Sequence, residues 1–127
     1  MNYILGYMTH VLSLIAVAIV YLLARVCVYK IHDVSMYPTI KPGSWVIVNP
    51  WAYVWAAPQV GDIIIIAHPS YKHELVKRLV RTSKGGLGDF YWVEGDNGDF
   101  SVDSRKFGNI FRPWLRGKVV WWAKGKR

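Results

Sequence analysis

The chain has 127 residues, a formal net charge of +8 and a sequence pI of about 9.7, with seven tryptophans and eight tyrosines. This length allows one domain plus one extra element. A basic balance suits nucleic acid or an anionic membrane surface, but the sequence has no nucleic-acid-binding motif, so we expect no nucleic-acid partner. The single cysteine, Cys27, excludes an internal disulfide, so the core must hold the fold together.

The N-terminal segment predicts a membrane-spanning helix. Residues 3–24 contain no acidic or basic residue other than His10, and as a helix they would extend about 33 Å, enough to cross a hydrocarbon core of about 30 Å. A cleaved signal peptide is the alternative, but it needs a basic stretch first and small residues afterwards. Here the first charge, Arg25, follows the segment. We expect an uncleaved anchor over residues 1–25 and a separate domain over residues 26–127.

The rest of the chain changes to strand-like periodicity. Short β-rich runs alternate with Gly, Pro and Asn turn signals, which is typical of a small, mainly antiparallel β domain. The run "GDIIIIAHP" has four successive isoleucines and predicts a strand buried on both faces. The other expected strands lie within 44–50, 74–82, 90–99 and 116–125.

Two aromatic segments stand apart from this pattern. Residues 51–57, "WAYVWAA", fit either a core segment or a loop that dips into the membrane interface, because loops are normally polar. Residues 121–127, "WWAKGKR", are either a strand end with a solvated tail or a segment that lies against anionic headgroups.

Lys77 is the first residue with unusual surroundings. In the predicted strand it shares a face with Leu75 and Leu79. Burial disfavours the charged ammonium and lowers the pKa of a lysine, which can then act as a general base. An edge strand with Lys77 extending to water is the alternative.

A loop serine and a polar turn complete the candidate chemistry. Ser35 lies in "HDVSMYPTIKPGSW", and a serine hydroxyl needs a neighbouring base to become a nucleophile, a role that lysine can fill. Residues 95–105, "GDNGDFSVDSR", carry a strong turn signal followed by polar side chains. Each motif alone fits an ordinary polar loop.

Together, these motifs resemble type I signal peptidases, the Ser-Lys membrane serine peptidases. "SMYPTIKPG" is similar to their nucleophile box, "VKR" to the base box and "GDNGDFSVDSRKFG" to the third box, in the family's order after a membrane helix. The resemblance implies a mainly β, signal-peptidase-like or repressor-peptidase-like catalytic domain with one N-terminal transmembrane helix. The short spacing between Lys77 and Gly95 implies a minimal form, similar to small bacterial members and mitochondrial inner-membrane peptidase subunits.

The resemblance also implies roles for individual residues. Ser35 would be the nucleophile and Lys77 the general base, while Ser101 would orient the lysine amine. The backbone N–H of Ser35 would contribute to the oxyanion hole. Residues implied to line apolar pockets for small substrate side chains are Ile31, Met36 and Val76, and residues implied to form a supporting ion-pair cluster are Arg78, Asp103 and Arg105. Asp103 has the alternative of only capping the turn.

Asp33 departs from the family pattern, which has serine or glycine two residues before the nucleophile. An ionised carboxylate there would repel a developing negative charge. We expect it to point away, to be protonated, or to leave the oxyanion hole to other donors. Ser44 replaces the usual aspartate after Pro-Gly. No cofactor or metal is expected, because the histidines at 10, 32, 68 and 73 lack zinc-ligand spacing.

The expected function is removal of signal peptides from exported preproteins that carry small residues before the cleavage site. A specialised peptidase for one precursor, a self-cleaving repressor-type protease and an inactive membrane-tethered β module are the alternatives. The expected partners are these substrates and the lipid bilayer, with a partner subunit left open. The family places the domain outside a bacterial cytoplasmic membrane, or alternatively in the mitochondrial inner membrane, although Arg25 and Lys30 favour a cytoplasmic domain.

Overall fold

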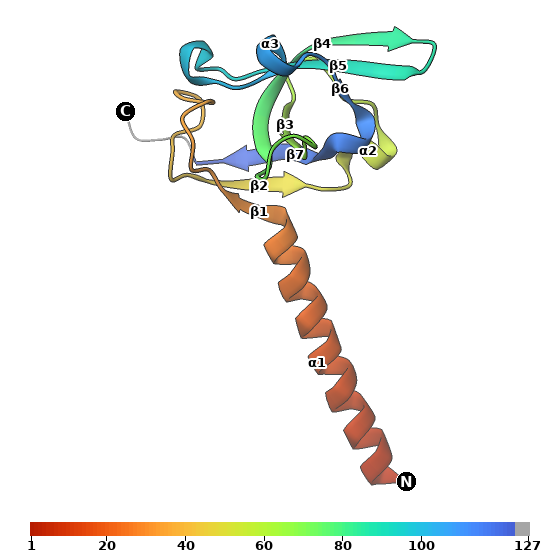
Figure 1. Cartoon of the computed structure of the whole chain (residues 1–127). Helices are drawn as coiled ribbons and strands as arrows, with labels where there is room; N and C mark the ends of the chain where they lie inside the picture. The colour runs from red at the N-terminus through yellow and green to blue at the C-terminus, as the bar shows by residue number, and fades with distance from the viewer. Residues whose placement is uncertain (124–127) are drawn as a thin grey trace.

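The computed structural model describes residues 1–123, apart from the side chains of Arg25 and Val26. It has one long helix, α1 (Asn2–Cys27), that projects from a curled antiparallel sheet (Figure 1). The predicted class, mainly β with one N-terminal apolar helix, is confirmed. Within the tail predicted to be a strand end or a headgroup contact, residues 124–127 lie outside the described residues.

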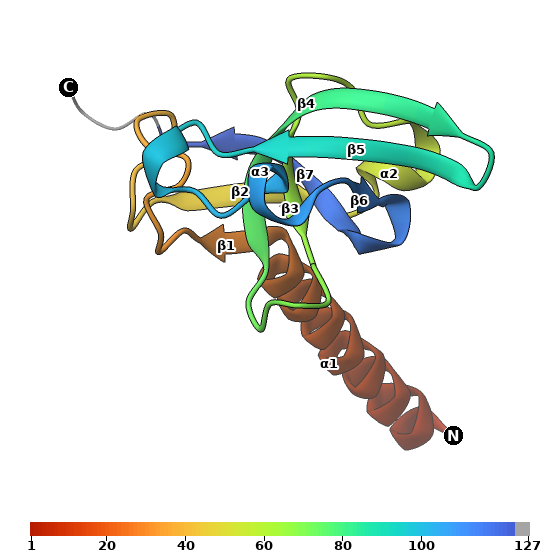
Figure 2. The ribbon, with the colours of Figure 1, turned by 45° about the horizontal axis from the view of Figure 1, so that its top comes forward.

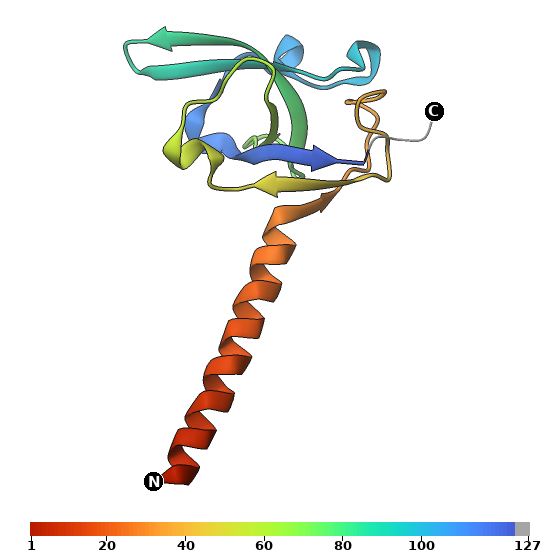
Figure 3. The ribbon, with the colours of Figure 1, turned by 180° about the vertical axis from the view of Figure 1, so that it is seen from behind.

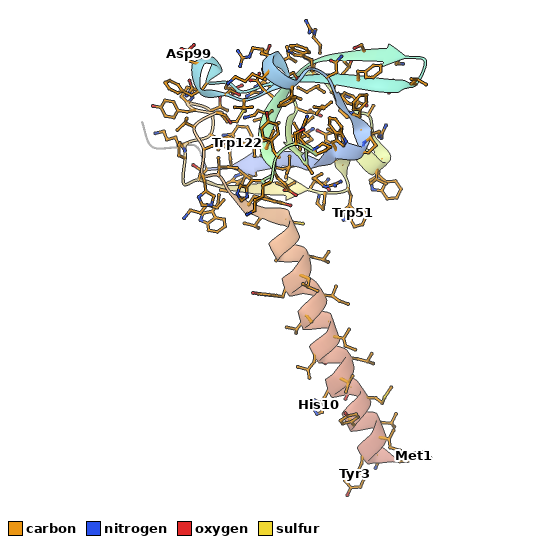
Figure 4. All side chains as sticks on the ribbon, viewed as in Figure 1. Met1, Tyr3, His10, Trp51, Asp99 and Trp122 are labelled. Atoms are coloured by element: carbon orange, nitrogen blue, oxygen red, sulfur yellow. The ribbon has the colours of Figure 1, made fainter. Side chains whose placement is uncertain are left out.

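Helix α1 has the length and composition of a membrane span. Asn2–Ala24 is a continuous apolar stretch of 23 residues, and none of it is buried against the domain. The side chains of Asn2–Ala24 point outward on all sides, as Figure 4 shows around His10. In water such a helix would expose a large apolar surface, which a bilayer would cover.

A seven-stranded sheet forms the domain, in the order β1-β2-β7-β3-β4-β5-β6, and every pair of neighbours is antiparallel. The strands are β1 (Val28–Lys30), β2 (Trp45–Asn49), β3 (Ile63–Ile66), β4 (Leu75–Gly85), β5 (Gly88–Glu94), β6 (Ile110–Phe111) and β7 (Leu115–Trp122). The sheet curls, so that β4 and β5 arch over the layer that β2 and β7 form near α1 (Figures 1 and 3). Short helical turns connect the strands: α2 (Ala52–Trp55), η1 (Gly98–Phe100), α3 (Ser104–Phe107) and η2 (Arg112–Trp114).

Strand β3 lies at the centre of the sheet and faces two cores. Ile63 and Ile65 pack in one cluster, while Ile64 and Ile66 pack in the other, so the predicted burial on both faces is confirmed. Side chains alternate across a strand, and four successive isoleucines can therefore serve both faces. Burying them stabilises the fold by about 1.5–3 kcal/mol per side chain.

The aromatic segment 51–57 is in part a core segment, one of its two predicted alternatives. Its one-turn helix α2 buries Tyr53, whose hydroxyl donates to Asp62 Oδ2 at 2.9 Å. Trp51 and Trp55 remain exposed. Figure 4 places Trp51 at the end of the domain from which α1 leaves. The segment is therefore anchored in the core by one ring and presents two others to the surroundings.

Candidate active site

Ser35 lies in the loop between β1 and β2, and the core holds this loop down. Ile31, Met36 and Ile40 bury their side chains in one core cluster, which anchors the loop on both sides of Ser35. At the base of the loop, Ile31 N–H donates to the Ser44 carbonyl at 2.9 Å. Ser35 is only 2% exposed. The apolar spacing of the loop therefore fixes the serine on a rigid support.

The hydrogen bonds of Ser35 lead to Asp33. The Ser35 hydroxyl donates to Asp33 Oδ1 at 3.1 Å, and the Ser35 backbone N–H approaches the same oxygen at 3.4 Å. Asp33 thus points toward the serine, which removes the first of the three expectations for this residue. The carboxylate lies at the backbone donor that the oxyanion hole would use.

Lys77 is buried in β4. It pairs with Ile64 of β3 and is 1% exposed, so it does not extend to water. Burial lowers the pKa of Lys77, while the charges of Asp33 and Asp103 oppose this shift and that of Arg105 adds to it. Within the described residues Lys77 forms no salt bridge. Burial therefore shifts the equilibrium of its amine toward the neutral, basic form.

Gly95 brings the serine loop and the third motif together. A Cβ atom built on Gly95 would lie 2.5 Å from the Ser35 carbonyl oxygen and 2.7 Å from Ser101 Cβ. The β4–β5 register pairs Arg78, the residue after Lys77, with Glu94, the residue before Gly95. Ser35 and Ser101 thus meet around a residue that has no side chain. Lys77 lies within electrostatic reach of Asp33 and Asp103, which are the hydrogen-bond partners of these two serines.

Asp103 forms the polar centre of the third motif. It is fully buried and accepts hydrogen bonds from Ser101 Oγ at 2.6 Å and from Gly95 N–H at 2.9 Å. It also pairs with Arg105 at 2.6 Å and caps α3 by accepting from Arg105 N–H. Burial alone would raise the pKa of Asp103, but these hydrogen bonds hold it well below its usual range. Asp103 therefore performs both of its expected roles, ion pairing and capping.

Arg78 departs from the expected ion-pair cluster. Its guanidinium pairs with Asp96, through Nε at 2.8 Å and Nη2 at 2.8 Å, rather than with Asp103. Asp96 also accepts from Thr39 Oγ1 at 2.5 Å. The reason is the strand pattern: Arg78 follows Lys77 and projects to the opposite face, away from Asp103. The supporting charges therefore form two separate pairs.

A large hollow adjoins the serine loop on one side. It has a volume of about 610 Å³. Its lining residues are Tyr29, Lys30, Ile31, His32, Asp33, Ile65, His73, Glu74, Leu75 and Val76. Ile31 and Val76, two of the three residues expected to line substrate pockets, form part of its apolar floor. The third, Met36, does not line the hollow, because its side chain is fully buried in the core behind it.

Sequence reasoning treated Asp96 and Asn97 only as a turn signal. In the structure Asn97 N–H donates to the Ser35 carbonyl at 2.8 Å, and its side-chain amide donates to the Val34 carbonyl at 3.1 Å. Asp96 ties the same turn to Arg78 and Thr39. The only feature of the sequence that could have indicated these contacts is the unusual length of the polar run 95–105. Among the described residues, no group of three or more His, Cys, Asp or Glu side chains is placed to hold a metal ion.

The chain is similar to known proteins of one family. The family model described as "Signal peptidase, peptidase S26" matches residues 4–83, more than half of the chain, and the match includes Ser35 and Lys77. The chain therefore belongs to the signal peptidase family, peptidase S26.

Two curated relatives carry the name mitochondrial inner membrane protease subunit 2. The protein from Mus musculus is 27% identical over 119 residues, covering 76% of this chain and 66% of the relative. The protein from Bos taurus is 28% identical over 115 residues, covering 76% and 65%. The chain thus spans just under two thirds of the length of these relatives.

Proposed function

We propose that the chain is a membrane-anchored serine endopeptidase that removes signal peptides from preproteins with a Ser35–Lys77 dyad. The observation that carries the proposal is the approach of Ser35 and Ser101 around Gly95, together with a buried Lys77 whose amine is influenced by the charges of Asp33 and Asp103. Family membership supports the reaction class, and the lowered pKa of Lys77 supports its role as base.

In the proposed mechanism, neutral Lys77 takes the proton of the Ser35 hydroxyl as the oxygen attacks the carbonyl carbon before the scissile bond. The tetrahedral intermediate places its negative oxygen at the Ser35 N–H. Collapse breaks the C–N bond, and Lys77 returns the proton to the leaving amine. Water then attacks the acyl-enzyme, with Lys77 again accepting a proton, and releases the signal peptide.

Ser101 and Asp103 would position the base. Ser101 donates its hydroxyl hydrogen to Asp103 Oδ2 at 2.6 Å, so its oxygen lone pairs are free of that bond and can accept from the lysine amine. Arg105 holds Asp103 in place from the solvent side. Ser101 would thus accept a hydrogen bond from the lysine amine, while Asp103 fixes the rotamer of the Ser101 side chain.

Substrate residues before the scissile bond would occupy the large hollow. Its floor at Ile31, Ile65 and Val76 is apolar, which suits small uncharged side chains. Met36 would support this floor from the core rather than touch the substrate.

The membrane would bring enzyme and substrate together. We propose residues 1–25 as an uncleaved anchor and residues 26–127 as the peptidase domain. The exposed rings of Trp45, Trp51 and Trp55 suit the headgroup region, and Trp51 lies at the α1 end of the domain (Figure 4). Their burial there would keep the domain at the bilayer, where a preprotein's cleavage site emerges.

The proposed location is the extracytoplasmic side of a bacterial cytoplasmic membrane. The relatives' name supports the mitochondrial inner membrane as the alternative, and the word "subunit" in that name supports a partner subunit. A specialised peptidase for one precursor fits the same site.

An inactive membrane-tethered module is the second candidate, because Asp33 occupies both donors of Ser35. Cleavage of a preprotein panel in detergent–lipid micelles separates the two. The panel is treated with wild type, Ser35→Ala, Lys77→Ala and Thr82→Ala, an exposed β4 position that serves as the control. Products that appear with wild type and Thr82→Ala alone support the peptidase. A wild type as inert as both site variants across the panel would leave the module.

A further inference from the structure

A small hollow lies on the other side of the Ser35 segment. It has a volume of about 360 Å³ and is lined by Val34, Tyr37, Pro42, Asn97 and Phe100. Among the described residues, it shares no lining residue with the large hollow. Nothing in the mechanism above uses it.

The walls of the small hollow are apolar side chains that face water. Val34 is 43% exposed, Tyr37 47% and Phe100 69%. Single exposed apolar residues are ordinary, but a contiguous group around a concavity indicates a surface that another molecule covers.

The small hollow is built on the same hydrogen bonds that hold Ser35. Asn97 donates from its side chain to the Val34 carbonyl at 3.1 Å and from its backbone to the Ser35 carbonyl at 2.8 Å. Phe100 N–H donates to the Asn97 carbonyl at 3.0 Å, and Tyr37 N–H donates to the Val34 carbonyl at 3.1 Å. The hollow is therefore preformed, so that binding a ligand there costs little conformational entropy in the lining residues.

Consecutive residues connect the two hollows. Asp33 lines the large hollow and Val34 lines the small one, and Ser35 follows directly. An extended peptide advances about 3.3 Å per residue. A substrate whose leading residues lie over Ile31 and Val76 would thus pass Ser35 and reach the small hollow within its next one or two residues.

The bilayer is a poor occupant for this surface. The turn η1, which carries Phe100, lies at the end of the domain away from α1 in two views (Figures 1 and 3). Figure 2, tilted toward the viewer, also separates this turn from the helix. Asp99, next to Phe100, is labelled at that far end in Figure 4.

We propose that the small hollow binds an apolar side chain of the substrate within the first two residues after the scissile bond. It selects preproteins whose mature part begins with a residue such as leucine or phenylalanine. The inference rests on the proposed function and adds a specificity site on the leaving side of the cleaved bond.

The test uses the full chain in detergent–lipid micelles and a peptide series that is identical up to the cleavage site. The two positions after that site carry Leu, Phe, Ser or Asp, and kcat/KM is measured for each peptide. We expect wild type to prefer the apolar peptides by about tenfold, the usual scale of discrimination by an apolar pocket. Phe100→Ser should reduce this preference to less than about twofold, while Phe100→Leu should retain it.

Leu87→Ser is the matched control, because Leu87 is fully exposed at the tip of the β4–β5 turn and lies outside both hollows. Equal cleavage of all peptides by wild type, or an unchanged preference in Phe100→Ser, overturns the proposal while leaving the peptidase intact. A wild type that cleaves no peptide removes the proposed function, and this proposal with it.

Repeating the series in phosphatidylglycerol vesicles tests the bilayer as occupant. If Phe100→Ser lowers cleavage of every peptide equally, in vesicles only and with the preference intact, the hollow is a lipid contact and the proposal is wrong. The expected result is the same loss of preference in vesicles and micelles.

Discussion

The Asp33 carboxylate accepts hydrogen bonds from the hydroxyl of Ser35 at 3.1 Å and from its backbone N–H at 3.4 Å. Asp33 Oδ1 thus accepts the hydroxyl hydrogen of the proposed nucleophile and also lies at the backbone N–H where the oxyanion would form. In the free protein, both hydrogen-bond donors of Ser35 are therefore occupied by this carboxylate. A substrate carbonyl must displace the carboxylate before it can use the backbone donor.

Replacing Asp33 with serine should therefore increase turnover. A serine there can donate to the oxyanion instead of repelling it, and a single oxyanion donor is commonly worth about 10²–10³ in kcat. Because the new side chain must still adopt a suitable rotamer, we expect kcat/KM at pH 7 to rise by about tenfold. Preprotein cleavage measured beside Asp89→Asn, an exposed carboxylate on β5, checks this. Unchanged or reduced activity would mean that Asp33 is no handicap.

The same substitution should move the pH dependence. The charge of Asp33 raises the pKa of Lys77, against the larger effect of burial. The neutral amine is the reactive form, so the rate rises as pH passes upward through this pKa. Removing the charge should lower the pKa of Lys77 and shift the acidic limb of the kcat/KM profile to lower pH. A limb that stays in place would show that the two groups are not coupled.

Lys77→Met should abolish cleavage and stabilise the domain. Burial holds the folded-state pKa of Lys77 below its unfolded value near 10.5, so folding at pH 7 carries a cost, either of burying the ammonium or of removing its proton. A methionine of similar length removes this cost, and we expect a gain of about 1–4 kcal/mol in the free energy of unfolding. Urea unfolding of the full chain in micelles measures it.

The pH dependence of this gain in stability supplies a control for the prediction. The penalty is complete below the folded pKa, shrinks as pH rises from there toward 10.5, and is absent above it. The advantage of Lys77→Met should therefore be larger near pH 7 than near pH 11. The exposed Lys84→Met should show no such pH-dependent gain. A destabilised Lys77→Met would indicate that the amine has partners that compensate its burial.

The sequence predicted the elements whose residues carry their own periodicity. The apolar run of α1 and the four isoleucines of β3 specify span and burial without knowledge of their neighbours. Lys77 does not belong to this group, because its strand pattern left both burial and extension to water open, and the structure shows burial. Short-range patterns of this kind predict the structure well because burial of their apolar residues stabilises the predicted helix or strand directly.

Contacts between distant segments were not predictable in the same way. Asn97 reaches Val34 across 63 residues, and Asp96 reaches Arg78 and Thr39. Nothing in the turn signal of residues 95–98 specifies these partners, since the same residues suit any tight loop. The prediction that Arg78 joins Asp103 in one ion-pair cluster was wrong for this reason. Strand alternation gives the face on which Arg78 lies, but the sequence does not specify where residues 95–105 run relative to that face.

Asp103→Asn should weaken the domain most at neutral pH. Burial would raise the pKa of Asp103, but hydrogen bonds from Arg105, Ser101 and Gly95 lower it well below the usual range. The stabilisation is therefore complete above the unfolded pKa near 4 and is lost as pH falls through the folded pKa. We expect a loss of about 3 kcal/mol at pH 7, in line with a broken buried charge network.

Unfolding curves at pH 7 and pH 3 would test this difference, with Asp89→Asn as the exposed control. The gap between wild type and Asp103→Asn should narrow at the lower pH. A gap that is equal at both values would assign the loss to altered hydrogen-bond geometry rather than to the charge.

Gly95→Ala should disable the site through a single methyl group. The added Cβ would lie 2.5 Å from the Ser35 carbonyl oxygen and 2.7 Å from Ser101 Cβ, so both segments must move apart. Displacements of about 1 Å can cost roughly 10² in rate, and overpacking costs about 1–3 kcal/mol of stability. We expect a loss of about 100-fold in kcat/KM under conditions where unfolding measurements show the variant to be folded. Gly86→Ala, where an added Cβ meets nothing within 4 Å, should behave as wild type. If Gly95→Ala retained full activity, the approach of Ser35 and Ser101 around this glycine could not be a requirement for catalysis, and the proposed dyad would need another support.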